Sequence, residues 1–290
     1  SGGPCEFVVL GLGKLGGREP NYHSDLDVAF LYDHDGSTQP PQRGRNSATS
    51  NHHFFEQLSQ RIVKRVTQLG PYGRLYEVDP RLRPHGQTGS LVMSVEEFAK
   101  FFSAGKAQFW QRQALCKARP VVGSDEARSA VMSVVRQVIT AVPWSDACAQ
   151  EIRALRAKLE QGADELNLKR APGGTIDIEF IVQMLQLKHA VSQPSVLQPG
   201  TLPAIAALLE AGYLSPPDAD FLNRSYRFLR TVESRIRLMA AAARHSLPRD
   251  PHELNKLAYF LDYEETRPLL ADCREFLTEN RRQFQKFFAS

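Results

Sequence analysis

The sequence predicts an α+β protein whose first half carries a small mixed sheet with helices and whose second half is an all-helical bundle. Short buried strand patterns occur in the first half, whereas apolar residues at helical spacing fill the second half. With 290 residues, 42% of them apolar and 23% charged, the chain can bury a core of ordinary globular size. We therefore expect two domains, over residues 1–140 and 141–290.

The first half alternates short apolar runs with turns and one amphipathic stretch. Residues 7–10 form a buried strand pattern followed at once by glycines, and residues 28–32 form a second strand pattern. The polar segment 33–50 predicts a loop, and residues 53–69 have helical spacing. The other elements expected in this half are one strand and two short helices, over residues 75–79, 95–102 and 108–118.

Helical spacing continues through the second half, with recognisable start and stop signals. Gly212 follows an apolar helix as a C-terminal stop, and Asp250-Pro251-His252-Glu253 combines an N-cap Asp, a Pro at N1 and a Glu at N3. The remaining expected helices cover residues 151–166, 175–190, 202–211, 218–243 and 266–288.

Composition and charge exclude several classes of protein. No run of 18 apolar residues is present, so we expect no membrane partner. The four cysteines lie far apart without metal-type spacing, which predicts free thiols in a reducing cytoplasm. The first 140 residues hold 17 basic and 13 acidic residues, whereas the last 150 hold 19 of each. This excess is too small for a nucleic-acid partner but suits a pocket for a phosphorylated small molecule.

The glycine-rich segment over residues 11–17 carries the chemical signal, and two familiar interpretations of it fail. A G-x-G-x-x-G pattern after a strand matches a dinucleotide fingerprint, but Pro20 leaves no room for the long helix that this fold requires. A P-loop needs Ser or Thr directly after Lys14, and Leu15 stands there.

In the third interpretation the glycines open a short helix whose N–H groups bind a triphosphate, and an Asp-x-Asp pair begins the next strand. Asp25 and Asp27 are two residues apart, so on a strand their side chains share one face. Two carboxylates on one face need a cation between them, and Mg²⁺ bridging nucleotide phosphates is the natural one. A glycine loop followed by Asp-x-Asp is the nucleotidyltransferase pattern shared with polymerase-beta-type enzymes.

The segment Y-E-V-D-P-R-L-R-P over residues 76–84 supplies a third carboxylate. If it continues as a strand, Glu77, Asp79, Arg81 and Arg83 fall on one face. Asp79 would then complete a metal triad, while the two arginines would bind phosphate or neutralise a leaving pyrophosphate. The alternative is a solvated edge strand with local ion pairs.

Four segments resemble the glutamine synthetase adenylyltransferase/adenylyl-removing enzyme family. They are GLGKLGGREPNYHSDLD over residues 11–27, YEVDPRLRPHG over 76–86, QALCKAR over 113–119 and GGTIDIEF over 173–180. In that family one long chain carries two homologous nucleotidyltransferase domains. One removes AMP from glutamine synthetase by phosphorolysis, and the other transfers AMP from ATP to a tyrosine of glutamine synthetase.

The stretches around Glu77, Gln113 and Asp177 look more like the C-terminal, transferring copy. The resemblance therefore implies a polymerase-beta-like nucleotidyltransferase fold, ATP as substrate and glutamine synthetase as protein substrate. It also implies glutamine and a PII-type signalling protein as regulators of the intact enzyme. Because the chain lacks an initiating Met and enters a strand at once, we expect it to be one half cut from a longer protein.

We expect two Mg²⁺ ions to bind at three catalytic carboxylates, those of Asp25, Asp27 and Asp79, the last of which is also a candidate proton acceptor. The expected nucleotide-binding residues are Gly13, Lys14, Gly16, Ser24, Arg81 and Arg83. Candidate phosphate contacts are Lys117 and Arg119, for which surface ion pairs are the alternative.

Asp177 and Glu179 are expected to brace the helical half against the nucleotide domain through Arg81 or Arg119. Two other functions stay open at this point. The chain could be the adenylyl-removing domain, or a catalytically silent module that binds a nucleotide.

Overall fold

The computed structural model describes residues 4–39, 47–71, 73–74, 76–83, 86, 89–105, 107–240 and 242–289. The chain separates into two compact units, which we call the sheet unit (residues 1–20 and 24–142) and the helical unit (residues 21–23 and 143–290). Part of the loop expected over residues 33–50 lies outside the described residues.

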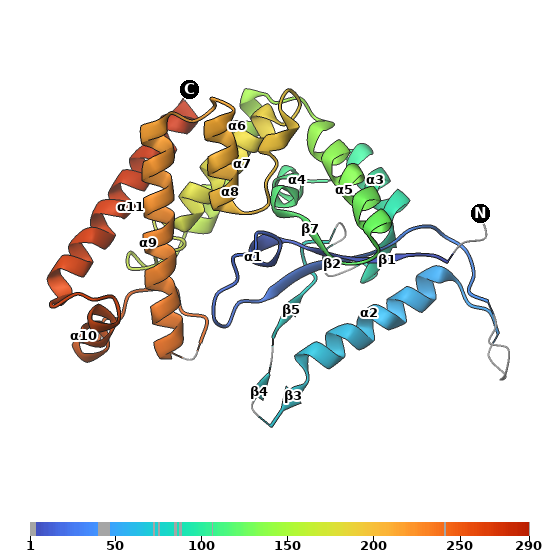
Figure 1. Ribbon diagram of the computed structural model, residues 1–290, viewed down its shortest axis with the longest axis horizontal. Helices are drawn as coiled ribbons and strands as arrows, with labels where there is room; N and C mark the ends of the chain where they lie inside the picture. The colour runs from blue at the N-terminus through green and yellow to red at the C-terminus, as the bar shows by residue number, and fades with distance from the viewer. Residues whose placement is uncertain are drawn as a thin grey trace. The chain divides into compact units, whose positions relative to one another are not determined.

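A five-stranded mixed sheet organises the sheet unit (Figure 1). Its central strands are β1 (Phe7–Gly11) and β2 (Leu26–Tyr32), which pair antiparallel. On the far side of β1 lies β7 (Arg119–Val122), also antiparallel. On the free side of β2 lie two short parallel strands, β5 (Val78–Asp79) and β6 (Val92–Ser94). The expected α+β class is confirmed.

Helix α2 (Asn51–Thr67) packs against this sheet through aromatic side chains (Figure 1). Ser50 caps the helix by accepting a hydrogen bond from the backbone N–H of His53 at 3.1 Å. The ring of Phe55 stacks on Phe7 and Tyr32 of the two central strands, with centroid distances of 5.3 and 5.5 Å. The helix is confirmed, but its buried face differs from the expected one: Phe55 is buried and Leu58 and Ile62 are partly buried, whereas Phe54 is 47% exposed.

The sheet unit contains elements that the sequence pattern does not reveal, namely β6, β7 and the helix α5 (Asp125–Thr140). The helix α3 (Val95–Ser103) begins with a capping box between Ser94 and Glu97. The unit's other elements are α1 (Gly13–Gly16), β3 (Leu69–Gly70), β4 (Gly73–Arg74), α4 (Phe109–Ala114) and the 3₁₀ turn η1 (Leu115–Lys117).

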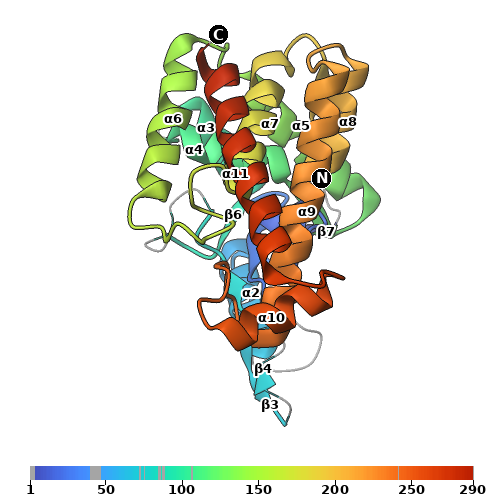
Figure 2. The same cartoon turned by 90° about the vertical axis from the view of Figure 1, so that its left-hand side faces the viewer.

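The helical unit consists of long helices that pack side by side (Figure 2). Among them, α7 (Thr175–His189) is buried on nearly every face, which fits its apolar sequence. The others are α6 (Asp146–Glu160), the 3₁₀ turn η2 (Pro194–Val196), α8 (Thr201–Glu210), α9 (Pro216–Ala240), α10 (Pro251–Phe260) and α11 (Thr266–Ala289). Asp250 caps α10 as its start signal predicts.

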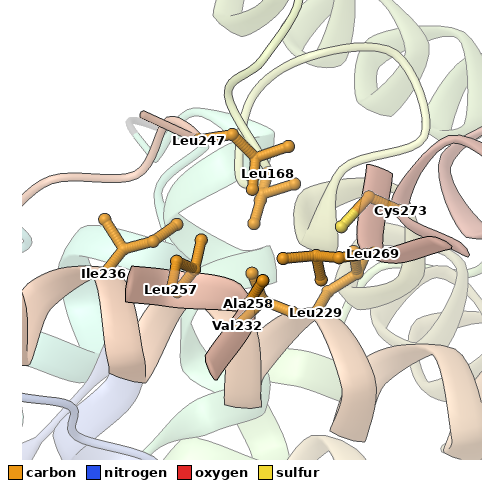
Figure 3. Close-up of a cluster of buried hydrophobic side chains, with 9 residues drawn as sticks. All are labelled: Leu168, Leu229, Val232, Ile236, Leu247, Leu257, Ala258, Leu269 and Cys273. Atoms are coloured by element: carbon orange, nitrogen blue, oxygen red, sulfur yellow. The ribbon is translucent and has the colours of Figure 1, made fainter. Parts of the chain in front are cut away.

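One core of the helical unit lies where α9, α10 and α11 meet (Figure 3). Leu229 and Val232 of α9 face Leu257 of α10 and Leu269 of α11, and all four are fully buried. Beyond this core, α9 carries a buried carboxylate.

That carboxylate is Glu233, which accepts hydrogen bonds from Arg230 and from Nδ1 of His245, the latter at 2.5 Å. Arg237 adds a third cation at 3.5 Å. Burial alone would raise the pKa of Glu233, but these partners hold it at about 2.

All four cysteines are free thiols, as expected. Burial raises the pKa of Cys116 and of Cys273 to about 12, so neither forms a reactive thiolate at neutral pH. Among the residues that the structure describes, no helix is both long and apolar enough to cross a membrane.

Candidate active site

The glycine segment forms the expected turn and short helix, because two glycines allow the backbone to approach its neighbours closely. Gly13 has a φ of +49°, and a Cβ atom there would lie 2.2 Å from Oδ2 of Asp27. At Gly16 a Cβ atom would lie 1.8 Å from the carbonyl oxygen of Lys117. The N–H of Leu12 donates to the carbonyl of Asp27 at 2.9 Å. The segment is thus tied directly to the strand that carries the Asp-x-Asp pair.

The structure brings the three expected carboxylates to one end of the β2–β5 pair. Asp27 and Asp79 are register partners on these parallel strands, so their side chains lie next to each other on one face. Asp79 is 9% exposed, and it lines a cavity of about 420 Å³ together with Asp25. Asp25 is exposed and directly precedes β2. Two of the acids therefore face the cavity, while Asp27 contacts the glycine segment.

The expected strand face over residues 77–83 is wrong beyond Asp79. The strand ends there, Pro80 follows, and the chain turns, with the N–H of Arg83 donating to the carbonyl of Pro80 at 3.3 Å. A proline cannot donate to a strand ladder, which is why the alternation does not continue. Both arginines nevertheless line the same cavity.

The two arginines have different surroundings. Arg81 donates two hydrogen bonds to Oδ1 of Asp79, one from its backbone N–H at 2.9 Å and one from its Nε at 2.8 Å. This hydrogen bonding holds the pKa of Asp79 below its usual value. Arg83 is buried and donates to the carbonyls of Pro80 at 2.8 Å and Gly89 at 3.1 Å. Arg83 thus holds the loop after β5, and its burial lowers its pKa.

The carboxylates have the chemistry of a cation site. Within the described part of the chain, no group of three or more His, Cys, Asp or Glu residues is gathered closely enough to hold a metal ion. Of the three acids, Asp79 binds the largely exposed guanidinium of Arg81, and this contact is the main cause that raises the pKa of Arg81; the charges of Asp25 and Asp27 raise it further. Carboxylate oxygens are the donors that Mg²⁺ prefers, so the chemistry of these residues fits that ion.

Lys117 and Arg119 support the glycine segment, so the alternative of surface ion pairs is wrong for both, and their role as phosphate contacts stays a prediction. The Lys117 ammonium is buried and lies 2.9 Å from Oε2 of Glu19. Arg119 donates from Nε to the carbonyl of Gly16 at 2.9 Å and from Nη2 to that of Leu15 at 2.8 Å. These bonds satisfy carbonyl groups at the C-terminal end of α1.

Two further expected site residues lie nearby. Lys14 is mostly buried, with its ammonium 3.9 Å from Glu19. Ser24, half-buried, directly precedes Asp25. Both positions agree with a site built around the glycine segment and the Asp-x-Asp pair.

The expected bracing role of Asp177 through Arg81 or Arg119 is wrong, because its carboxylate binds partners inside the helical unit. Asp177 is fully buried and accepts hydrogen bonds from Nε of Arg156 and, at 2.9 Å, from the N–H of Gly173. Arg281 lies 3.4 Å away. Burial raises the pKa of Asp177 despite these cations. Glu179 accepts a bond of 3.5 Å from the hydroxyl of Tyr226, also in the helical unit.

Two carboxylates that support the loops around the site, those of Glu56 and Glu19, are not among the residues that the sequence predicts. Glu56 of α2 accepts hydrogen bonds from the backbone N–H groups of Leu91 at 2.9 Å and Val92 at 3.3 Å, and Leu91 lines the cavity. Glu19 binds Lys117 across a separation of 98 residues. Glu19 lies two residues after the glycine segment, and this proximity is a signal in the sequence. The partners of both carboxylates are distant in sequence, so the contacts themselves could not be predicted.

Two family models match successive parts of the chain. Residues 1–134 match the family model described as glutamate-ammonia ligase adenylyltransferase, and residues 147–289 match the model described as GlnD PII-uridylyltransferase.

Three curated relatives are all named bifunctional glutamine synthetase adenylyltransferase/adenylyl-removing enzyme. The protein from Thioalkalivibrio sulfidiphilus is 38% identical over 82% of this chain and 25% of its own length. The one from Rhodopseudomonas palustris is 38% identical over 80% of the chain and 24% of its length. The one from Xanthomonas campestris pv. campestris is 32% identical over 98% of the chain and 30% of its length.

The chain thus spans about a quarter to a third of the length of the curated relatives it matches. Matches to two adjoining family models cover the sheet unit and the helical unit in turn. The chain belongs to the glutamine synthetase adenylyltransferase/adenylyl-removing enzyme family.

Proposed function

We propose that this chain transfers AMP from ATP to a tyrosine hydroxyl of glutamine synthetase, with Mg²⁺ as the metal. The observation that carries the proposal is the register pairing of Asp27 with Asp79 beside the glycine segment. The names of the relatives supply the substrate class. We assign the chemistry to the domain over residues 1–140 and a supporting role to residues 141–290.

In this proposal Asp25, Asp27 and Asp79 hold two Mg²⁺ ions, which when bound would polarise the phosphates and lower the pKa of the tyrosine hydroxyl. The tyrosine oxygen attacks the α-phosphorus in line, the bond from that phosphorus to pyrophosphate breaks, and the phenolic proton passes to solvent. A carboxylate whose pKa is held low is a weak base, so the contact with Arg81 favours Asp79 as a cation ligand over a proton acceptor.

The triphosphate would lie along the glycine segment. Gly13 would provide a backbone N–H group, Lys14 an ammonium, and Ser24 a hydroxyl at the adjoining turn. The N–H of Gly16 already donates to the carbonyl of Leu12 at 2.8 Å, so Gly16 would contribute by allowing close approach of the backbone. Arg81 and Arg83 line the same cavity as Asp79, so their guanidinium groups would be placed to bind the leaving pyrophosphate.

The regulatory and cellular setting is proposed from the helical unit and the thiols. A match of residues 147–289 to a PII-uridylyltransferase model supports a PII-type signalling protein that acts through the intact enzyme. Four free thiols support a reducing, cytoplasmic location.

A transfer assay tests the function directly. The chain is incubated with ATP labelled at the α-phosphate, Mg²⁺ and unmodified glutamine synthetase, and in parallel adenylylated glutamine synthetase is incubated with the chain and phosphate. Label moving onto the protein supports transfer. Label coming off identifies the adenylyl-removing domain instead, and activity in neither direction identifies a silent module.

Variants then link the activity to the site. We expect the double variant Asp25→Asn/Asp27→Asn to lose transfer by more than about 1,000-fold while keeping its fold. Asp33→Asn, which changes an exposed carboxylate just after β2, is the matched control and should transfer normally. Near-normal transfer by the double variant would overturn the proposed mechanism.

A further inference from the structure

Glu19 joins two lysines that lie far apart in the sequence. Its Oε2 is 2.9 Å from Nζ of Lys117 and 3.9 Å from Nζ of Lys14. All three side chains are mostly buried, with 13%, 7% and 16% of their surfaces exposed for Glu19, Lys117 and Lys14. The backbone adds a link, because the N–H of Glu19 donates to the carbonyl of Lys14 at 2.8 Å.

The two lysines are bound to Glu19 unequally. Lys117 makes a hydrogen-bonded ion pair, and its own carbonyl oxygen packs against Gly16. Lys14 lies 3.9 Å away, a separation longer than a hydrogen bond, so its attraction to Glu19 is purely that of charge. Lys117 is therefore the fixed partner of the carboxylate and Lys14 the one that can leave.

We propose that Glu19 is a positioning residue for Lys14, holding its ammonium beside the glycine segment until the triphosphate of ATP binds there. This inference rests on the proposed function. When Lys14 turns to the phosphates, Lys117 keeps the charge of Glu19 paired. The release therefore leaves no unpaired buried carboxylate, which would be costly.

The arrangement also places charge where an anion enters. Two ammonium groups approach one carboxylate beside the glycine segment, which favours an incoming anion there. Ordering Lys14 before binding reduces the entropy that its side chain must lose on contact with phosphate.

A double-mutant cycle between Glu19 and Lys14 tests the proposal. Glu19→Gln should weaken binding of a non-hydrolysable ATP analogue by about tenfold, because it removes the carboxylate that attracts the Lys14 ammonium. Binding of AMP, which lacks the outer phosphates, should change by less than about twofold. Lys14→Met should weaken ATP-analogue binding at least as much, and the double variant should bind no more weakly than Lys14→Met alone. Glu126→Gln, an exposed acid at the start of α5, is the matched control and should bind like wild type.

A second variant is needed if Glu19→Gln does not fold, because that substitution removes the carboxylate that pairs with the buried ammonium of Lys117. Glu19→Gln/Lys117→Met removes both charges of the buried pair and should show the same loss of ATP-analogue binding with the fold retained.

The proposal would be overturned if the affinity losses of Glu19→Gln and Lys14→Met were additive, or if ATP analogue and AMP lost affinity equally. Either result would show that Glu19 only stabilises the surrounding structure. Calorimetry measures binding without transfer. A chain that binds ATP but never modifies glutamine synthetase would therefore refute the proposed function and still test the role of Glu19.

Discussion

Replacing Gly13 by alanine tests whether the close approach of the glycine segment to Asp27 matters for catalysis. With a φ of +49°, an alanine pays about 1 to 2 kcal/mol of backbone strain. Its Cβ would also lie 2.2 Å from Oδ2 of Asp27, and ordinary contact begins at 3.4 Å, so the carboxylate or the segment must move by roughly 1.2 Å. A displacement of about 1 Å at a reacting centre costs on the order of 100-fold in rate.

Gly105→Ala is the matched control, because Gly105 has a φ of +68° and no atom lies where its Cβ would go. Gly105→Ala should lower the unfolding midpoint by about 2 to 8 °C in thermal denaturation, and Gly13→Ala by at least as much, because its clash with Asp27 adds to the same backbone strain. AMP transfer from labelled ATP should fall about 100-fold for Gly13→Ala and stay near wild type for Gly105→Ala. Normal transfer by Gly13→Ala, or an equal loss in the control, would refute this reasoning.

Three further substitutions probe charges that the structure places. Arg81→Gln should raise the pKa of Asp79 towards its usual value, which carboxyl NMR titration would detect; an unchanged pKa would contradict the observed pairing. Asp177→Asn should destabilise the helical unit by about 3 kcal/mol in urea unfolding, because Arg156 is then left buried beside a neutral amide. Glu233 has a folded pKa of about 2 against 4.5, so its stabilisation, about 3 kcal/mol, is complete above pH 4.5 and lost as pH falls towards 2. The acid-unfolding curve of Glu233→Gln should therefore lack that slope; an unchanged slope would contradict it.

Much of the fold follows from local patterns in the sequence. Apolar runs and glycines locate β1, α1 and β2, and helical spacing with capping residues locates α2 and the long helices of the second half. Strand β7 contains Pro120, which suits an edge strand but obscures its pattern. Strand β6 is only three residues long, so too few residues alternate to reveal it.

Helix α5 shows a different reason for a missed element. Its sequence is rich in valine, which favours strands over helices, although Ser124 caps it and Asp125 and Glu126 occupy its first turn. Here packing overrides intrinsic propensity.

The candidate site divides in the same way. The carboxylates of Asp25, Asp27 and Asp79 could be inferred because strand alternation and a nucleotidyltransferase pattern depend on near neighbours. The partners of Lys117 and Arg119 could not, because they lie 98 to 104 residues away and are set by tertiary packing. The partner of Asp177 could not be predicted for the same reason. A buried carboxylate needs a cation beside it, but the sequence does not show whether that cation is Arg156, as observed, or another arginine.

The pairing of β5 with β2 extends over only two residue pairs, Leu26 with Val78 and Asp27 with Asp79. Strand β1, in contrast, pairs with β2 along five positions. The acids are therefore brought together by the shortest ladder on β2, and that ladder closes a segment of some fifty residues. Local opening of β5 costs far less than unfolding the sheet, so its backbone amides should exchange with deuterium well before those of β1. A site held by so short a ladder can loosen and reassemble in each catalytic cycle while the rest of the sheet stays intact.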